Sequence, residues 1–435
     1  MVEPGTAESG QSDEELLDRF QRGAFGYFLE QFNPDNGLVG DTDRAGAPAS
    51  IAVVGFALSC YPVGVERGWI ARADAAQRAL AVLRFFCDSR QGDQPDATGY
   101  KGFYYHFLDM KTGRRVWQSE ISLIDTTLLL AGVLTAATYF DRDAADENEI
   151  RRRADFIYRR VDWLWARGGG VSEWQGWKPE GGFLHYGWDG YDEAIILYVL
   201  GMASPTFPLP ADNYAKWTAT YQWENIYDVE FLYGGPLFLH HYSQAWIDFA
   251  GIRDQFMREK KSDYFENSRR AALVQREYAR RNPYGFAGYG KDCWGITACD
   301  GPGFTTLTIG GRERRFLGYA ARGVPFGPDD GTIDPCATLA SLPFTPELSL
   351  SALRHFCTHY PDMIRRSRLP SGFNPSFPGG SAAGWISQGS FGLDQGIVVL
   401  MIENYRSGLI WRLMRRCPYI GQGLRRAGFT GGWLS

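Results

Sequence analysis

Apolar residues recur along most of the chain at the spacing typical of α-helices. The first stretch shows the pattern: Ser12 precedes three acidic residues, and Leu16, Phe20 and Phe28 then mark one apolar face. A serine caps a helix N-terminus well, and acidic side chains favour the first turn. The same reasoning predicts further helices over 48–63, 72–88, 119–140, 143–166, 190–203, 210–221, 233–249, 264–281, 334–342, 346–359 and 394–416.

Two kinds of predicted helix alternate along the chain. Some are apolar on every side, which indicates burial, whereas the arginine-rich stretches 147–166 and 265–281 carry a charged stripe that faces water. Inner helices alternating with outer ones predict an all-α fold, an (α/α)6 barrel built as a toroid of six helical hairpins. The length suits one such domain over residues 12–435. The fully apolar stretches are 51–60, 123–137, 194–202 and 396–402.

Short β-hairpins are predicted in the connections between the helices. Residues 101–117 form one around Lys111–Gly113, and residues 171–187 form a second. Residues 1–11 are small and polar and are predicted to be a disordered tail. Long loops rich in glycine and proline are usually functional in compact domains. Here they span 283–303, 318–335 and 367–392.

The composition narrows the class of protein. The net charge is −5, and no basic patch with interleaved aromatic residues occurs, so nucleic acid is not an expected partner. No apolar run approaches the roughly 18 residues that span a bilayer, and no signal peptide is visible, so membrane insertion is not expected. We expect a soluble cytoplasmic protein, or a periplasmic one if an export signal has been removed.

The seven cysteines are odd in number and include no CxxC pair. Several lie in apolar helical stretches, which predicts buried thiols in a reducing compartment. A disulfide between Cys293 and Cys299 is the minor alternative.

Several carboxylic acids begin or interrupt the most apolar helices. Asp192 and Glu193 precede the stretch 194–202, Asp125 lies inside another, and Asp394 begins a third. Each one alone fits a helix cap or a buried ion-pair partner. Together they indicate function, because burying several charges is costly. Cleavage of a glycosidic bond needs two such acids, one on each side of the bond.

Aromatic side chains beside these acids favour a sugar as the substrate, since a flat ring covers the apolar face of a pyranose. The aromatic residues predicted to contact substrate are Trp174, Trp177, Trp188, Tyr191 and Trp385. His241 is predicted to hydrogen-bond a sugar hydroxyl. No metal or cofactor is expected, because the histidine pairs lack an HExxH pattern. The P-loop, GxSxG and dinucleotide fingerprints are also missing, which disfavours nucleotide and serine-hydrolase chemistry.

Six segments resemble the bacterial glycoamylase domain family. The family includes the endo-β-1,2-glucanases of glycoside hydrolase family 144 and domains of cyclic β-1,2-glucan synthases. The resemblance covers residues 13–416 and implies an (α/α)6 barrel that hydrolyses β-1,2-glucan with inversion. The segments are GWDGYDEAIILYVLGMASPTFPLP (187–210), GGPLFLHHYSQAWIDFAGIRD (234–254), DYFENSRRAALVQREYA (263–279), YGKDCWGITACDGPG (289–303), RGVPFGPDDGTIDPCATLASLPFTPE (322–347) and FGLDQGIVVLMIENYRSGLIW (391–411).

The resemblance also implies roles for particular residues. Glu193 in GYDEA is the implied general acid, and Asp125 in LIDTT and Asp394 in LDQG are the other catalytic carboxyls. Which of these two activates water stays open. Ile397 replaces the proline that the family has after LDQG. Within the matching segments, the further residues predicted to bind substrate are Asp192, Asp300, Arg322, Asp330 and Gln395.

Other functions stay open at this point. The chain could be a β-1,2-glucan transglycosylase, or a glycan-binding protein that has lost its activity. The extended loop 367–384 could block one end of a groove and convert endo action into exo action. The residues do not reveal the glycosidic linkage by physical reasoning, nor the oligomeric state.

Overall fold

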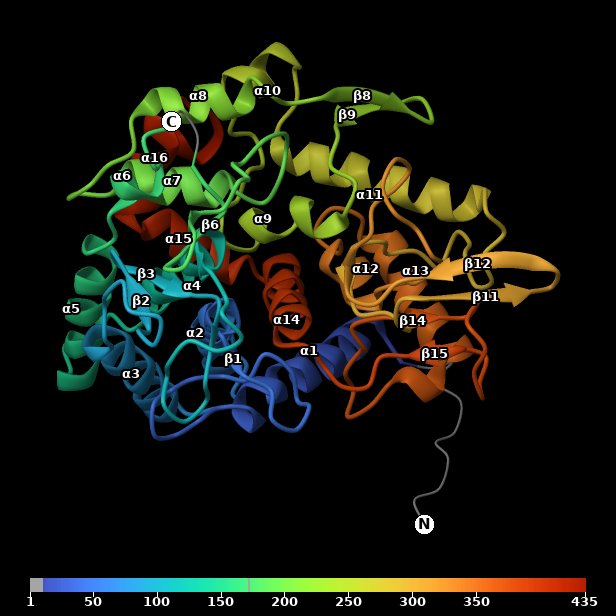
Figure 1. The fold of residues 1–435 in the computed structure, drawn as a ribbon, viewed down its shortest axis with the longest axis horizontal. Helices are drawn as coiled ribbons and strands as arrows, with labels where there is room; N and C mark the ends of the chain where they lie inside the picture. The colour runs from blue at the N-terminus through green and yellow to red at the C-terminus, as the bar shows by residue number, and fades with distance from the viewer. Residues whose placement is uncertain (1–10, 171–172) are drawn as a thin grey trace.

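A computed structural model of the chain describes residues 11–170 and 173–435. Apart from Gln11, the predicted tail 1–11 lies outside the described residues. The described chain is rich in helices, with small sheets in the connections (Figure 1). Its main helices are α1 (Asp13–Glu30), α2 (Ile51–Glu66), α3 (Arg72–Asp88), α4 (Leu123–Tyr139), α5 (Ala145–Arg159), α6 (Trp163–Ala166), α7 (Ile195–Ala203), α8 (Ala211–Thr218), α9 (Tyr242–Trp246), α10 (Gln255–Glu259), α11 (Tyr264–Arg281), α12 (Pro335–Ala340), α13 (Pro346–His359), α14 (Gly392–Arg406), α15 (Leu409–Arg416) and α16 (Pro418–Arg426).

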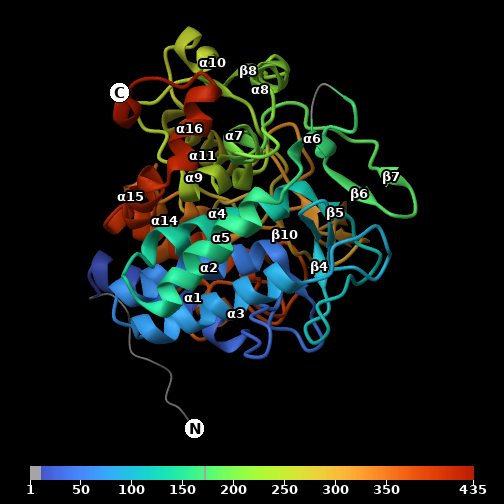
Figure 2. The same ribbon diagram turned by 90° about the vertical axis from the view of Figure 1, so that its left-hand side faces the viewer.

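The helices divide into a buried set and a surface set, as their sequences predict. Helices α2, α4, α7, α12 and α14 are buried along most of their length, and α14 lies at the centre of the view in Figure 1. Helix α2 packs against α4 and α14, and α12 packs against α14. Around them, α1 covers α14, while α3 and α5 run side by side over α2 and α4 (Figure 2).

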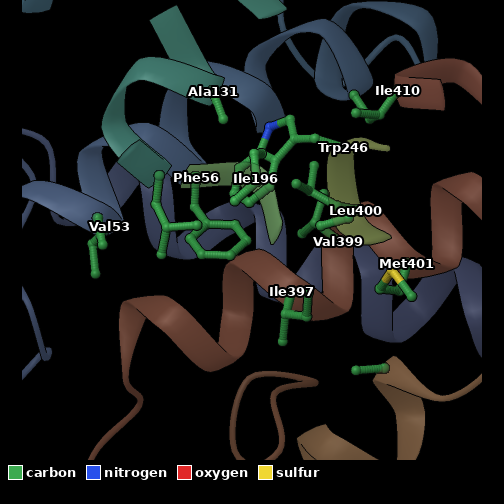
Figure 3. Packing of buried hydrophobic residues seen from close by; sticks show 14 of the residues in the cluster. Val53, Phe56, Ala131, Ile196, Trp246, Ile397, Val399, Leu400, Met401 and Ile410 are labelled. Carbon is green, nitrogen blue, oxygen red and sulfur yellow. The ribbon is translucent and has the colours of Figure 1, made fainter. Parts of the chain in front are cut away.

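Side chains from several inner helices meet in one apolar core. Phe56 of α2, Ala131 of α4, Ile196 of α7, Trp246 of α9 and Val399 of α14 converge in this core (Figure 3). The rings of Phe56 and Trp246 lie 4.9 Å apart, and the Trp246 indole donates a hydrogen bond to the Ser59 hydroxyl of α2 at 2.8 Å. The inner helices are therefore fixed to one another by both packing and a buried hydrogen bond.

Two glycines allow α2 and α4 to touch through their backbones. A β-carbon added to Gly132 would lie 2.1 Å from the carbonyl oxygen of Gly55, and one added to Gly55 would lie 2.3 Å from that of Leu128. No β-carbon tolerates such distances, so only glycine at both positions permits this crossing.

Helix boundaries follow local chemistry closely. Ser12 and Glu15 form the capping box expected at the start of α1. Helices α3, α11 and α13 have the predicted bounds. The predicted helix 394–416 is two helices, because Gly408 adopts a left-handed φ of 68° between α14 and α15. The predicted helix 233–249 is only the short turn η1 (Leu237–His240) followed by α9.

The sheets confirm hairpins in the connections between helices. A five-stranded antiparallel sheet has the order β2-β3-β5-β6-β7, and its β6–β7 hairpin falls within the predicted range 171–187. The predicted turn near Lys111 is closed by a backbone hydrogen bond from Asp109 to Arg114 at 2.8 Å. The strands of this sheet are β2 (Gly99–Tyr100), β3 (Phe103–Tyr105), β5 (Ile121–Ser122), β6 (Gly176–Lys178) and β7 (Gly182–Phe183).

Two further hairpins, β8–β9 and β11–β12, are missing from the sequence prediction. The β8–β9 turn places Tyr227 and Asp228 in left-handed conformations without the Asn-Gly or Asp-Gly signal that usually marks such turns. The strands outside the main sheet are β1 (Ala49–Ser50), β4 (Phe107–Leu108), β8 (Trp223–Ile226), β9 (Val229–Leu232), β10 (Ala298–Cys299), β11 (Thr305–Ile309), β12 (Arg312–Phe316), β13 (Ala320–Ala321), β14 (Phe373–Asn374) and β15 (Trp385–Ile386).

None of the seven cysteines, which all lie in the described residues, forms a disulfide, so Cys293 and Cys299 are not paired with each other; all but Cys87 are buried. Among the helices of the described residues, none is both long enough and apolar enough to cross a bilayer.

Because α2 and α4 touch through their backbones at Gly132, one added methyl group at this position should lower the stability of the protein markedly. Gly132→Ala should destabilise the protein by about 3 kcal/mol, because overpacking against a backbone outweighs the better helix propensity of alanine. Gly421→Ala in α16 is the matched control: its β-carbon would meet only the flexible Arg425 guanidinium, so stability should hold or rise by up to about 1 kcal/mol. Urea unfolding monitored by circular dichroism measures both, and equal stability of the two variants would contradict the prediction.

Candidate active site

The predicted catalytic acids lie where inner helices begin. Asp125 is in the first turn of α4, Asp394 is in the first turn of α14, and Glu193 lies two residues before α7. Asp334 caps the N-terminus of α12. The first N–H groups of a helix have no partner within it and carry a partial positive charge, so this end of a helix favours anions.

Glu193 is a partly buried acid whose pKa lies near neutrality. Burial raises its pKa to about 7, and the negative charge of Asp125 adds to this shift. The Ser243 hydroxyl donates to the Glu193 backbone carbonyl at 2.6 Å and accepts from the N–H of Ile196 at 3.1 Å, which holds this entry to α7 in place. A carboxyl group with such a pKa is suited to donate a proton at neutral pH.

Asp394 is a buried acid with an available oxygen. Burial raises its pKa to about 7, with further contributions from Asp41 and Asp300, while the Ser371 hydroxyl opposes the shift. Its Oδ2 atom is buried and has no hydrogen-bond partner among the described residues. Such an oxygen is usually satisfied by water or by a ligand. The neighbouring Asp334 is also buried, and its pKa is raised well above the usual range by burial and by Asp394.

Asp125 is held by groups on both sides. It accepts a hydrogen bond from the Ser122 hydroxyl, and its Oδ2 lies 3.6 Å from Nε2 of His106. The other ring nitrogen of His106 lies 2.9 Å from Oε1 of Glu120. Burial lowers the pKa of His106, but Asp125, Glu120 and Asp41 raise it by more, to about 9. His106 is therefore a cation at neutral pH.

Two residues that the sequence prediction missed complete this cluster. Burial and Asp125 raise the pKa of Asp41 to about 6, although His106 opposes the shift. The Asp41 carbonyl accepts a backbone hydrogen bond from Gly392 at the start of α14. His106 reaches the site because its own carbonyl accepts from Ile51 at the start of α2. Neither residue follows a motif, and only these long-range backbone contacts reveal them.

Three of the predicted aromatic contacts remain partly accessible. Trp177 packs against Tyr100 and Trp165, with ring centroids 4.9 and 5.9 Å away. The Trp174 indole donates to the Arg167 carbonyl at 3.0 Å, and Trp385 lies in β15.

The segment before α7 is more deeply buried than predicted. Trp188 is 7% exposed, and its indole N–H has no partner among the described residues. The Tyr191 ring is stacked on Tyr264 with centroids 6.0 Å apart and is 7% exposed, and its contact with substrate stays a prediction. Asp192 accepts from the N–H of Ala194 at 2.8 Å, as a helix cap would.

Arg322 and Asp330, both predicted to bind substrate, form a buried ion pair with each other. The guanidinium Nε lies 2.7 Å from Asp330, and both side chains are at most 1% exposed. Arg322 also donates to the carbonyls of Cys299 and Gly318. Buried charges in proteins are normally paired in this way, so these two residues support the loops around them.

His241 and Gln395, two further residues predicted to bind substrate, are also interior residues. His241 hydrogen-bonds the Ser341 hydroxyl at 2.9 Å, and burial lowers its pKa to about 3, so it is neutral. Gln395 donates to the Leu369 carbonyl at 3.1 Å. Both are only 1–2% exposed, and their contact with a sugar stays a prediction.

Asp300 is near the acids and remains partly accessible. It forms an ion pair with Arg44 and accepts a hydrogen bond from the Ser387 hydroxyl at 2.7 Å. These contacts join the loop around Arg44 to the loop before α14. In the part of the chain that the structure describes, no three His, Cys, Asp or Glu side chains are grouped as metal ligands.

Comparison with known proteins gives consistent matches. Residues 185–418 match the family model Glycoamylase, described as "Putative glucoamylase". The exo β-1,2-glucooligosaccharide sophorohydrolase (non-reducing end) of Parabacteroides distasonis is 30% identical over 95% of this chain. The chain spans only 58% of the length of that relative.

Solved structures match over nearly the whole chain. A "putative glucoamylase" from Bacteroides uniformis has a TM-score of 0.87 and 32% identity, covering 98% of this chain and 100% of that one. The endo-β-1,2-glucanase from Chitinophaga pinensis, solved with sophorotriose and glucose, has a TM-score of 0.84 and 28% identity, with coverage of 98% and 100%.

The raised pKa values predict a stability change that depends on pH. Glu193 and Asp394 have higher pKa values in the folded state than in the unfolded state, so the folded chain holds their protons more tightly. The fold is therefore most stable near pH 4, where both states are largely protonated, and it loses stability as pH rises through about 7. Glu193→Gln and Asp394→Asn should therefore each raise the free energy of unfolding by about 2 kcal/mol at pH 8 relative to the native chain, with little difference at pH 4.

Thermal unfolding at the two pH values measures this difference. The exposed carboxyl of Glu313 on β12 provides the control, since Glu313→Gln should change stability equally at both pH values. A stability gain for Glu193→Gln that is the same at pH 4 and pH 8 would refute the electrostatic explanation.

Proposed function

Since the chain belongs to the glycoamylase family, we propose that it is a glycoside hydrolase that cleaves β-1,2-linked gluco-oligosaccharides. Two relatives that match nearly all of this chain support the substrate: one is named a β-1,2-glucooligosaccharide sophorohydrolase and the other an endo-β-1,2-glucanase. The observation that carries the proposal is the presence of two carboxyl groups at helix starts, the partly buried Glu193 and the buried Asp394, whose pKa values burial raises to about 7.

We also propose that the helices close into an (α/α)6 barrel, as one domain over residues 12–435. The inner ring would contain α2, α4, α7, α9, α12 and α14, and the outer ring α1, α3, α5, α8, α11 and α13. Contacts between α2 and α4, between α12 and α14, and between α14 and α2 support this order. The first outer helix, α1, packs on the last inner one, α14, which supports closure of the ring.

In the proposed reaction, Glu193 protonates the leaving glycosidic oxygen. Its raised pKa keeps a large fraction of the carboxyl protonated at neutral pH, which a general acid requires. The neighbouring Asp125 adds to the raised pKa of Glu193. The positively charged His106 lies on the other side of Asp125, with Nε2 3.6 Å from its Oδ2.

We assign the activation of water to Asp394 in preference to Asp125. The Oδ2 atom of Asp394 has no partner among the described residues and can accept a proton from water, whereas Asp125 already accepts from Ser122 and faces His106. A water activated on the side of the sugar opposite to Glu193 gives inversion. Inversion is also what the family resemblance implies.

The proposal predicts a selective hydrolase that depends on Glu193. Linear β-1,2-glucan should yield new reducing ends, whereas β-1,3-, β-1,4- and α-1,4-glucans should not. Glu193→Gln should lose at least about a hundredfold in rate, the usual contribution of general acid catalysis. Glu313→Gln serves as the control and should keep full activity.

The outcomes separate the other candidate functions. Products longer than the starting oligosaccharide would indicate a transglycosylase. Binding of the glucan without any new reducing ends would indicate a glycan-binding protein. Near-full activity of Glu193→Gln would remove Glu193 from the role of acid.

The loop 367–384 supports a blocked end to the substrate site. The backbone N–H of Asp300 donates a hydrogen bond to the Ser371 carbonyl at 3.2 Å, and the Ser371 side chain faces Asp394. Together with the Arg44–Asp300 ion pair, these contacts bring three loops to the side of Asp394. If these loops close one end of the substrate site, only the end of a glucan chain can enter, and the enzyme should act in exo mode.

Product sizes measured over time test this idea. Early release of one small oligosaccharide from β-1,2-glucan is expected, and a substrate labelled at its reducing end shows from which end it is released. An early ladder of many sizes would mean that the loops leave the site open at both ends.

A further inference from the structure

Trp117 is an aromatic side chain that the fold leaves in water. It is 71% exposed, and it is the only tryptophan among the exposed large apolar side chains of the described residues. Tryptophan is usually buried over most of its surface, because covering so large a ring is favourable. Tryptophan is one of the residues most often found at binding interfaces, because its ring offers a large contact area and one polar group.

The backbone around Trp117 is strained in a way that displays the ring. Trp117 and Gln118 have φ values of 55° and 53°, so two successive residues other than glycine are left-handed. Each such residue costs free energy and persists only where the surroundings impose it.

Neighbouring contacts impose this conformation. The Arg115 guanidinium is almost fully buried, lies 2.6 Å from Glu180 and covers the Tyr105 ring at 4.7 Å. The N–H of Ser119 donates to the Val116 carbonyl at 3.0 Å, closing the turn that contains Trp117 and Gln118. The turn is therefore fixed from within the protein, while the ring that it carries makes little contact with the protein. A binding surface prepared in this way loses little entropy when a ligand arrives.

A line of rings connects Trp117 to the acids. Its ring centroid lies 5.3 Å from Phe107, and the Phe107 ring is stacked on His106 at 3.9 Å. His106 in turn contacts Asp125 and Glu120. One ring, that of Phe107, thus lies between Trp117 and the charged His106, a span on the scale of neighbouring units in a sugar chain.

We propose that Trp117 is the stacking platform of a distal subsite, where it binds a glucosyl unit beyond the two that flank the cleaved bond. The assignment rests on the proposed function for the identity of the sugar. The C–H groups on one face of a pyranose are apolar, and an indole ring covers them without adding charge near the acids. Substrates long enough to reach Trp117 bind more tightly than shorter ones.

Kinetics as a function of chain length test the subsite. Trp117→Ala is expected to raise KM about tenfold for β-1,2-linked oligosaccharides long enough to reach the turn, equivalent to about 1.4 kcal/mol. The kcat/KM value for the shortest cleaved oligosaccharide is expected to stay within about twofold. Trp117→Phe keeps a ring and restores part of the affinity. Tyr405→Ala is the matched control, because Tyr405 is an exposed ring at the end of α14 away from Asp394.

Two results would overturn the proposal. One is an equal loss at every chain length, which would give Trp117 a structural role. The other is no change at any length.

The melting temperature of Trp117→Ala is expected to equal that of the native chain, since the Trp117 ring is exposed.

Calorimetric titration separates this proposal from the proposed function. A five-unit β-1,2-linked oligosaccharide is titrated into Glu193→Gln, with and without Trp117→Ala, and this measurement needs no turnover. If the native chain hydrolyses nothing but Trp117→Ala weakens binding about tenfold, the hydrolase proposal fails and the subsite stands. Equal affinity of the two variants, or binding by neither, overturns the subsite.

Discussion

The removal of carboxyl groups from water is the constraint around which this end of the molecule is arranged. Glu193, Asp394 and Asp334 have raised pKa values, chiefly because burial removes the water that would stabilise their charged forms. The fold tolerates them because they stand at helix N-termini, where unpaired N–H groups favour negative charge. The protonated His106 offsets part of the remaining repulsion beside Asp125. The same burial that makes Glu193 able to donate a proton also weakens the fold above neutral pH.

The rigid contact between inner helices gives these charges fixed positions. Asp125 lies two turns before Gly132 on α4, and Gly132 rests directly on the backbone of Gly55 in α2. Phe56, next to Gly55, packs on Trp246 of α9, so the start of α4 is tied to the opposite side of the core (Figure 3). Positions set by backbone contact vary less than positions set by flexible side chains, which suits groups that must act on one bond.

The sequence predicts those features that arise from neighbouring residues. Apolar periodicity is sufficient to predict α3, α11 and α13 with their observed bounds, and it distinguishes buried helices such as α2 from surface helices such as α5. Features created by distant contacts are not predictable in this way. His106 is a single histidine between aromatic residues, and its pairing with Glu120 and Asp125 depends on the register of β3 with β5.

Motif membership is also a poor guide to whether a residue touches substrate. Arg322 and Asp330 lie in a long matching segment, yet they bind each other in the interior. Trp117 lies outside every such segment, yet it is exposed at the end of the rings that lead to His106.

The arrangement of charge and rings separates two tasks that would otherwise interfere. The acids need a site with little water, because hydration would return their pKa values to the ordinary range. A charged group that held a distant sugar would act on the same acids through Coulomb forces and change their protonation. Neutral rings such as Phe107 and Trp117 cover apolar surface without this effect. Rings along the substrate path can therefore raise the affinity for a long substrate. They do so without changing the electrostatic interactions among His106, Asp125 and Glu193.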